Sequence, residues 1–226
     1  MHRSMSSIKT KLNPKRSKNT RNRLIRSAEH LFANRGFGGL TIREVARRSE
    51  TNLASAHYHF GSKEAMVLEM LSSRIKPINE KRLHYLQNAR EDSRGKPLKT
   101  IEIFKALILP IGEEISKSSH SRKTLALLVA RSFTEPASFI QKMHSRFFGE
   151  LCEIFILELQ RAHPQAKEID IYWNLHFAIS SMLGALAQHR RLHDFSGGRC
   201  DDQNAEDMIH RLLVFVTNGF EAGLKA

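Results

Sequence analysis

The chain of 226 residues carries 36 Lys and Arg against 23 Asp and Glu, a formal net charge of +13, and 41% of its residues are apolar. This length and apolar content exclude disorder over most of the chain. The longest apolar run, at 124–130, is far shorter than the roughly 20 residues of a membrane-spanning helix. The basic segment 1–23 leads into no secretory signal, so we expect a cytoplasmic protein without a membrane partner, with Cys152 and Cys200 as reduced thiols.

The positive charge is concentrated near the N-terminus. Residues 1–64 contain 14 Lys and Arg and 4 acidic residues, a net +10, whereas residues 65–226 have a net charge of +3. Such a concentration of charge indicates a polyanionic partner bound by one end of the chain. Residues 1–19 form a basic arm, which we predict to be disordered and solvated; the alternative is an arm that enters a groove of nucleic acid.

Apolar residues at a spacing of 3.6 positions predict a first helix at 21–35, ended by Gly36. Thr41 is well placed as an N-cap, with Glu44 completing a capping box, and a short helix is expected at 41–49. The turn 50–52 then leads to a second short helix at 53–60.

The remainder of the chain has a helical pattern without strands, so the fold class is all-α with about nine helices. Proline and glycine mark the boundaries. The expected helices are 62–92, kinked or broken at Pro77; 97–118, bent at Pro110; 120–133; 136–162; 166–193; and 203–223.

Two short helices after a longer one predict a helix-turn-helix, whose second helix fits the major groove of DNA. Residues 41–71 read TIREVARRSETNLASAHYHFGSKEAMVLEML. This segment resembles the DNA-binding region of TetR/AcrR-type bacterial transcriptional repressors, whose hallmark Tyr/His-Phe-x-x-Lys-Glu is matched at 58–64. The resemblance implies a DNA-binding domain at 20–66, and a ligand-binding and dimerisation domain at 67–226.

Side chains of the helix-turn-helix are the expected DNA contacts. Thr41, at a helix N-terminus, can bind a phosphate, and Arg43 is placed for phosphate or guanine. Arg47 and Arg48 either contact phosphates or are solvated. The resemblance assigns Leu53, Ala54, Ser55 and His57, where a tyrosine is common in the family, to base edges and nearby phosphates, and Tyr58, His59 and Lys63 to the DNA backbone.

One helix-turn-helix reads only a few base pairs, so we expect the protein to bind DNA as a dimer. The last two predicted helices are suited to pairing with those of a partner chain. Small residues on the first and an apolar stripe on the second would form a four-helix bundle with a partner, as the resemblance implies. The alternative is that both stripes belong to the core of one chain. The expected dimer residues are Ser180, Gly184, Ala187, Leu212, Val216 and Phe220.

The middle helices are rich in aromatic residues, which we interpret either as plain core or as the lining of an apolar ligand cavity. Residues 130–136 (ARSFTEP) and 172–187 resemble the fatty-acid-responsive or acyl-CoA-responsive branch of the family, which suggests an apolar inducer such as an acyl chain. The expected lining residues are Phe104, Leu107, Phe148, Trp173 and Phe177, with Arg131, His144 and His176 as polar groups that orient the ligand.

Catalytic and metal-binding patterns are weak. The stretch HRRLH places His189 and His193 four residues apart but lacks the glutamate of a zinc protease, and no nucleophile and base can be paired. We therefore expect no enzyme activity, metal or cofactor. The sequence predicts a bacterial, nucleoid-associated repressor that binds a palindromic operator as a dimer; the alternative is a nonspecific or architectural nucleic-acid-binding protein that uses the basic arm.

Overall fold

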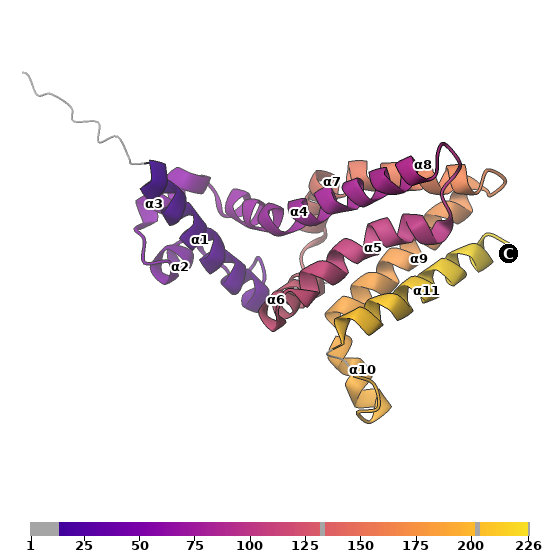
Figure 1. Ribbon diagram of the computed structural model, residues 1–226. Helices are drawn as coiled ribbons and strands as arrows, with labels where there is room; N and C mark the ends of the chain where they lie inside the picture. The colour runs from indigo at the N-terminus through magenta and orange to yellow at the C-terminus, as the bar shows by residue number, and fades with distance from the viewer. Residues whose placement is uncertain (1–13, 132–133, 202–203, 226) are drawn as a thin grey trace, which may run out of the picture. The chain divides into compact units, whose positions relative to one another are not determined.

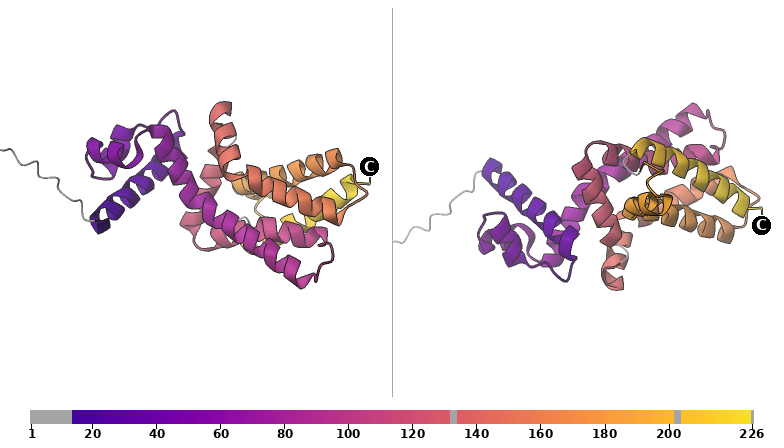
Figure 2. Two further views of the ribbon diagram at one scale, coloured as in Figure 1. Left: turned by 90° about the horizontal axis from the view of Figure 1, so that it is seen from above. Right: turned by 90° about the horizontal axis from the view of Figure 1, so that it is seen from below.

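The structure is a computed structural model that describes residues 14–131, 134–201 and 204–225 (Figures 1 and 2). These residues contain eleven helices and no strand, which confirms the all-α prediction. The chain divides into two compact units, the first ending at Met70 and the second beginning at Leu71. None of the helices in this part of the chain is both long and apolar enough to cross a membrane.

The first unit is a small helical domain built on α1 (Pro14–Arg35), α2 (Ile42–Arg48), α3 (Leu53–Phe60) and the first turns of α4 (Lys63–Asp92). α1, α2 and α3 pack against one another. Their inward side chains, together with those from the start of α4, are almost completely buried. This core includes Leu24, Phe32, Val45, Ala56 and Met66.

α1 begins at Pro14, earlier than the start expected near Arg21. Residues 1–13 of the basic arm lie outside the described residues. Residues 14–19 are helical, so the prediction of disorder is wrong for this part of the arm. The cause is local: proline is favourable at the first position of a helix, and lysine and arginine are good helix formers.

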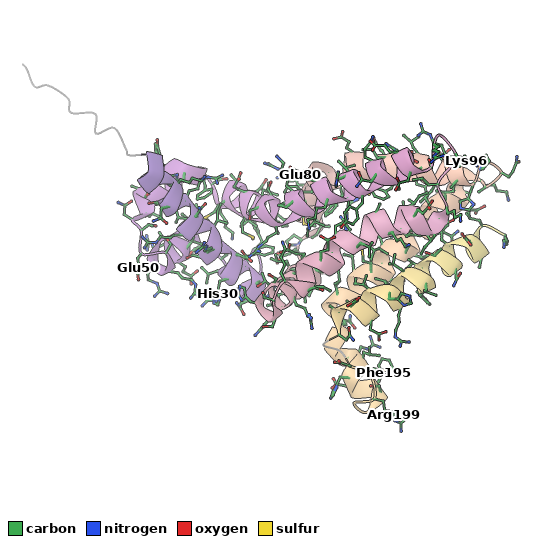
Figure 3. All side chains as sticks on the ribbon, viewed as in Figure 1. His30, Glu50, Glu80, Lys96, Phe195 and Arg199 are labelled. Atoms are coloured by element: carbon green, nitrogen blue, oxygen red, sulfur yellow. The ribbon has the colours of Figure 1, made fainter. Side chains whose placement is uncertain are left out.

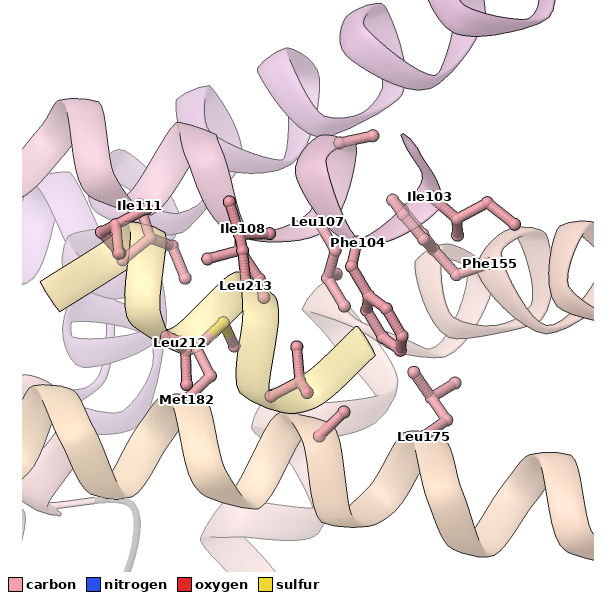
Figure 4. Packing of buried hydrophobic residues seen from close by; sticks show 14 of the residues in the cluster. Ile103, Phe104, Leu107, Ile108, Ile111, Phe155, Leu175, Met182, Leu212 and Leu213 are labelled. Carbon is pink, nitrogen blue, oxygen red and sulfur yellow. The ribbon is translucent and has the colours of Figure 1, made fainter. Parts of the chain in front are cut away.

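The second unit contains the rest of α4 and seven further helices. α11 packs against both α5 and α9, and all three contribute to one apolar core (Figures 1 and 4). Phe104 of α5 and Phe220 of α11 meet edge to face, with ring centroids 5.4 Å apart. The helices are α5 (Thr100–Ser116), α6 (Ser119–Arg131), α7 (Ala137–Phe147), α8 (Gly149–Ala162), α9 (Glu168–Ala187), α10 (His189–Ser196) and α11 (Ala205–Gly223).

Both internal prolines lie within continuous helices. α4 runs through Pro77 and α5 through Pro110. The alternative of a break at Pro77 is therefore wrong, because the remaining hydrogen bonds of a long helix, with its packing, can outweigh the one that proline removes.

Two predicted helices are each divided in two, which accounts for eleven helices instead of nine. The segment 136–162 is interrupted at Phe148, where φ is −127° and ψ is −18°. The Asn79 side chain donates a 2.7 Å hydrogen bond to the carbonyl of Phe147 at this break. The segment 166–193 is interrupted at Gln188, where φ is −123°, and α10 extends past the end of α9 with Phe195 exposed (Figure 3).

Candidate nucleic-acid interface

The N-terminus of α2 is fixed by the residues that the sequence indicated. Thr41 is the N-cap, and its hydroxyl accepts a 3.2 Å hydrogen bond from the backbone N–H of Glu44. The Glu44 carboxylate accepts from the Thr41 hydroxyl (3.0 Å) and from Arg35 (2.7 Å). These bonds, with that from Thr41 first, lower the pKa of the Glu44 carboxyl. Thr41 and Arg43 are exposed at this end of α2, and nearby N–H groups can bind a phosphate.

α3 is held at both ends and along one side. The Asn52 side chain caps it by accepting a 2.6 Å hydrogen bond from the backbone N–H of Ser55. Gly61 ends it with a φ of +69°, a conformation that glycine adopts without the strain of a Cβ. Ala56 is buried against the first unit's core. The sequence pattern predicts only a turn at Asn52, although an asparagine directly before a helical pattern is the usual signal of a cap.

The opposite side of α3 is open to solvent. Leu53, Ala54, His57 and Tyr58 are exposed there, with Tyr58 73% accessible, and Ser55 is half-buried. A tyrosine exposed to this extent can offer both its ring and its hydroxyl to a partner. The helix therefore presents a narrow face of small, polar and aromatic side chains, which is suited to the base edges of a major groove.

His59 and Lys63 are partly buried within the first unit, although the resemblance assigns them to contacts with the DNA backbone. His59 is half-buried, and its Nε2 atom is fully buried without a hydrogen-bond partner in the described chain. Burial, followed by the charge of Arg21, lowers the pKa of His59. The Lys63 amine lies over the ring of Phe37, 4.4 Å from its centroid. Both side chains contribute to packing within the first unit, a role that the motif alone does not indicate.

Several basic residues hold the first unit together. Arg21 forms a 2.7 Å ion pair with Glu69 and lies over the ring of Phe60. Arg23 donates to the backbone carbonyl of Ser49 and lies 3.2 Å from the Glu50 carboxylate. Part of the N-terminal charge therefore fixes the turn between α2 and α3, and the sequence carries no local signal for these partners.

A cleft of about 410 Å³ lies between α1 and α2. His30, labelled in Figure 3, is one of the lining residues, and its pKa is lowered by burial and then by the charges of Arg48 and Arg35. Arg47 and Arg48 are exposed, which fits both the solvated and the phosphate-contacting alternatives. The lining residues are His30, Leu31, Asn34, Arg35, Glu44, Arg47 and Arg48.

The residues expected to line a ligand cavity fall into a buried and an exposed group, and in the exposed group the rings of Trp173, His176 and Phe177 contact one another. Phe104 and Leu107 are buried in the core, and Phe148 is half-buried at the break between α7 and α8. Trp173 and Phe177 are 56% and 55% exposed, because the inward side of α9 is formed by other residues such as Leu175 and Met182. His144 and His176 are also exposed, and Arg131 lies half-buried at the end of α6. The role of this set in ligand binding stays a prediction.

Three of the residues expected in the dimer interface are buried within the chain itself. Leu212, Val216 and Phe220 are almost fully buried in the core that α11 forms with α5 and α9, so they are not available to a partner. Their burial agrees with the alternative in which the apolar stripe of α11 belongs to the core of one chain. On α9, Ser180 is exposed, whereas Gly184 and Ala187 are half-buried. The exposed apolar side chains of α11 are instead Val214 and Phe215.

Within the described residues, no group of three or more His, Cys, Asp or Glu side chains is placed to hold a metal ion. The first unit offers hydrogen-bonding groups and positive charge on its exposed surface. The unit is a helix-turn-helix in which both short helices are capped, the second helix is exposed and the neighbouring surface is basic. These features are typical of a DNA-binding regulator.

Comparison with known families gives the particular family. Residues 24–70 match the family of bacterial regulatory proteins named tetR, and residues 105–219 match the C-terminal domain described as tetracyclin repressor-like. The second match alone covers half of the chain. The chain belongs to the TetR family and is a transcriptional regulator with a helix-turn-helix DNA-binding domain and a C-terminal ligand-binding domain.

Individual relatives are distant. The chain is 22% identical over 152 residues to the probable HTH-type transcriptional regulator YttP of Bacillus subtilis, covering 67% of this chain and 69% of that protein. Among solved structures it resembles HlyIIR, a hemolysin II transcriptional regulator (TM-score 0.58, 19% identity, 89% of this chain and 98% of that chain). It also resembles NalD, the secondary repressor of the MexAB-OprM multidrug efflux pump in Pseudomonas aeruginosa (TM-score 0.59, 21% identity, 88% and 96%). At these identities the structural likeness establishes the fold alone.

Proposed function

We propose that the protein is a repressor that binds a palindromic operator as a homodimer and is released by a mostly apolar small molecule. The observation that carries the proposal is the exposed face of α3, capped by Asn52 and ended by Gly61. Its outward residues are the ones expected to read DNA. The net charge of +10 in residues 1–64 supports binding to a polyanion.

In this proposal each side chain of the helix-turn-helix has a role. Ser55 and His57 read base edges together with Leu53 and Ala54, and Tyr58 donates its hydroxyl to a phosphate. At the start of α2, Thr41 and Arg43 contact the backbone of the DNA. His59 and Lys63 contribute mainly by shaping α3 and the chain after it, since both are partly buried.

The proposed dimer surface is the outward face of α9 and α11. Trp173, Phe177 and Phe215 are each more than half exposed, and the two helices pack against each other. Large aromatic side chains of this exposure are typical of interface anchors. The surface replaces the buried stripe of α11, while Ser180 remains part of it because it is exposed on the same helix.

The proposed release follows from the course of α4, which carries residues of both units. A ligand that binds one conformation of the second unit more tightly shifts the population toward that conformation. If the two DNA-binding domains of the dimer then no longer match the spacing of the half-sites, the operator is released.

Competition binding tests this function. Operator sequences are selected from a randomised duplex pool with the full-length protein, and the best palindrome is then measured against random duplex at physiological salt. We expect a preference of about 10³ or more, which is usual for specific regulators. A preference below about tenfold would favour the nonspecific or architectural alternative.

A further inference from the structure

The cleft between α1 and α2 has no role in the proposed function. All of its lining residues belong to these two helices of the first unit, whereas the proposed reading of bases uses the exposed face of α3. Its volume of about 410 Å³ lies within the range of small-molecule sites, roughly 300–1,000 Å³. A compact ligand in such a hollow can contact both helices at once.

The lining of the cleft carries an excess of positive charge. It contains one acidic residue, Glu44, and three arginines, which are Arg35, Arg47 and Arg48. His30 also lines the cleft, and its lowered pKa leaves the ring neutral at pH 7. Three positive charges and one negative charge give the lining a net charge of +2. A ligand with a charge of −2 would therefore balance it.

Of the three arginines, one is already paired. Arg35 lies 2.7 Å from the Glu44 carboxylate, which also accepts a hydrogen bond from the Thr41 hydroxyl. Arg47 and Arg48 are exposed, and within the described residues no acidic side chain pairs with either of them. Their guanidinium groups are therefore available to a ligand from solution.

The two unpaired arginines are suited to phosphate. A guanidinium can donate two parallel hydrogen bonds to the oxygens of one phosphate group. Successive residues of a helix point about 100° apart, so Arg47 and Arg48 reach the cleft from different directions. Together they can hold one phosphate from two sides, or the two phosphoryl groups of a diphosphate.

His30 responds to the charge inside the cleft. Its pKa is lowered by partial burial and then by the charges of Arg48 and Arg35. Arg47 and Glu44 are the other charged groups of the lining. A bound anion offsets the repulsion between the arginines and a protonated ring, and therefore raises the pKa of His30. By the same linkage, the anion binds more tightly as the pH falls through this pKa.

We propose that the cleft between α1 and α2 binds a small molecule that bears a phosphate or diphosphate group, held by Arg47 and Arg48. A phosphate monoester carries a charge of about −1.5 to −2 at pH 7, which matches the lining. A single carboxylate would leave one guanidinium without a counter-charge. The inference goes beyond the proposed function, because it gives the regulator an input that does not pass through the second unit.

Inorganic pyrophosphate is the probe for this site. Titration calorimetry on the full-length protein without DNA, at constant ionic strength, measures its binding against that of acetate. We expect pyrophosphate to bind at least about tenfold more tightly, as one additional charge-assisted hydrogen bond would produce. Absence of saturable binding, or equal binding of acetate, would overturn the proposal.

The pKa of His30, followed by NMR with and without pyrophosphate, locates the bound anion. The signal is assigned by its loss in His30→Gln. Pyrophosphate should raise this pKa and leave that of His120 unchanged, because His120 is exposed on α6 in the second unit. An unchanged pKa of His30, or an equal change at both histidines, would contradict binding in the cleft.

A pair of double variants assigns the binding to the two arginines. Arg47→Gln with Arg48→Gln should weaken pyrophosphate binding about tenfold or more. Lys18→Gln with Arg26→Gln is the matched control, since it removes the same charge from positions of α1 outside the cleft. All four side chains are exposed, so neither variant should lower the melting temperature. Equal weakening by both variants would show binding to general positive charge and overturn the proposal.

The salt dependence of DNA binding separates a free phosphate compound from the backbone of DNA. If the cleft accepted a phosphate of the duplex, the variant Arg47→Gln with Arg48→Gln would reduce the slope of log Kd against log salt by about 0.9 for each lost contact. We expect a smaller change than this. A reduction of about 0.9 or more would assign the cleft to DNA and overturn the proposal. Failure of the operator selection would contradict the repressor function alone, because pyrophosphate binding is measured without DNA.

Discussion

Side chains on α3 differ in how strongly the domain constrains them. Ala56 is buried and Ser55 is tied by its backbone N–H to Asn52, whereas Tyr58 and His57 extend into solvent. A residue exposed on a helix that is fixed at both ends can contact a ligand with little loss of conformational entropy elsewhere. This makes Tyr58 the simplest position at which to separate binding from folding.

Replacing Tyr58 with phenylalanine removes only the hydroxyl. If that group donates to a phosphate, affinity should fall about tenfold for operator and random duplex alike, because phosphate contacts carry no sequence information. The melting temperature should not change, since the side chain is 73% exposed. Fluorescence anisotropy with both duplexes measures the effect.

Tyr172→Phe is the matched control. This tyrosine is also exposed, but it lies on α9 and donates a 2.9 Å hydrogen bond to Glu168. Its replacement should leave DNA affinity unchanged. An equal loss in both variants would mean that Tyr58 has no specific role at the DNA.

The helix boundaries of the first unit are determined largely by capping. Asn52 begins α3, and Asn204 begins α11 in the second unit by accepting a 3.0 Å hydrogen bond from the backbone N–H of Asp207. The two caps are chemically alike but occur in units with different tasks. They allow a loss of helix stability to be compared with a loss of binding.

Asn52→Ala should lower the free energy of unfolding by about 1 kcal/mol, the usual contribution of an N-cap. Because the cap fixes the first turn of α3, which carries Leu53, Ala54 and Ser55, DNA affinity should fall as well. Chemical denaturation and anisotropy measure the two effects. Asn204→Ala should show a similar loss of stability with unchanged DNA affinity, and equal losses of affinity would contradict a local role for Asn52.

The sequence predicts boundaries well where the signal is local. α2, α3 and α4 lie within a residue or two of their expected bounds because Thr41 and Gly61 act on adjacent backbone. The division at Phe148 could not be predicted in this way. At that point Asn79, distant in sequence, donates to the Phe147 carbonyl that a continuous helix would use itself.

The sequence predicts some of the site residues better than others. The exposed residues of α3 follow from the motif and from the short apolar face that holds the helix. The aromatic-rich pattern and the resemblance predict Trp173 and Phe177 in the lining of a cavity, but α9 has apolar residues on both of its sides. Periodicity alone does not show which of two apolar faces is turned inward, and the packing of α11 against α9 decides it.

The excess of positive charge and the proposed dimer surface belong to different parts of the sequence. The excess of positive charge lies in residues 1–64, and the largest exposed aromatic side chains of α9 and α11 lie in the second unit. Positive charge favours binding to DNA, and exposed aromatic side chains favour contact with a second copy of the chain. Two half-sites of a palindrome can be bound together only if such a copy is present.

Trp173→Glu places a charge on the proposed dimer surface and should convert the dimer to monomers, because an unpaired charge in an interface is costly. Sedimentation measures the association, and operator affinity should fall by at least about tenfold through loss of the second half-site. Leu157→Glu is the control, since Leu157 is comparably exposed but lies on α8. Dissociation by both variants, or by neither, would contradict the assigned surface.

The most direct test of the central claim, that α3 reads the sequence of the operator, is to repeat the selection from randomised duplex with altered proteins. The variant Ser55→Gln with His57→Asn changes hydrogen-bonding groups on α3, and amide side chains favour adenine. The control Arg47→Gln with Arg48→Gln removes charge from α2. We predict that the control recovers the wild-type motif with lower or equal affinity, whereas the α3 variant recovers a different motif. Recovery of the same motif by the α3 variant, or of no motif by the wild-type protein, would contradict the claim.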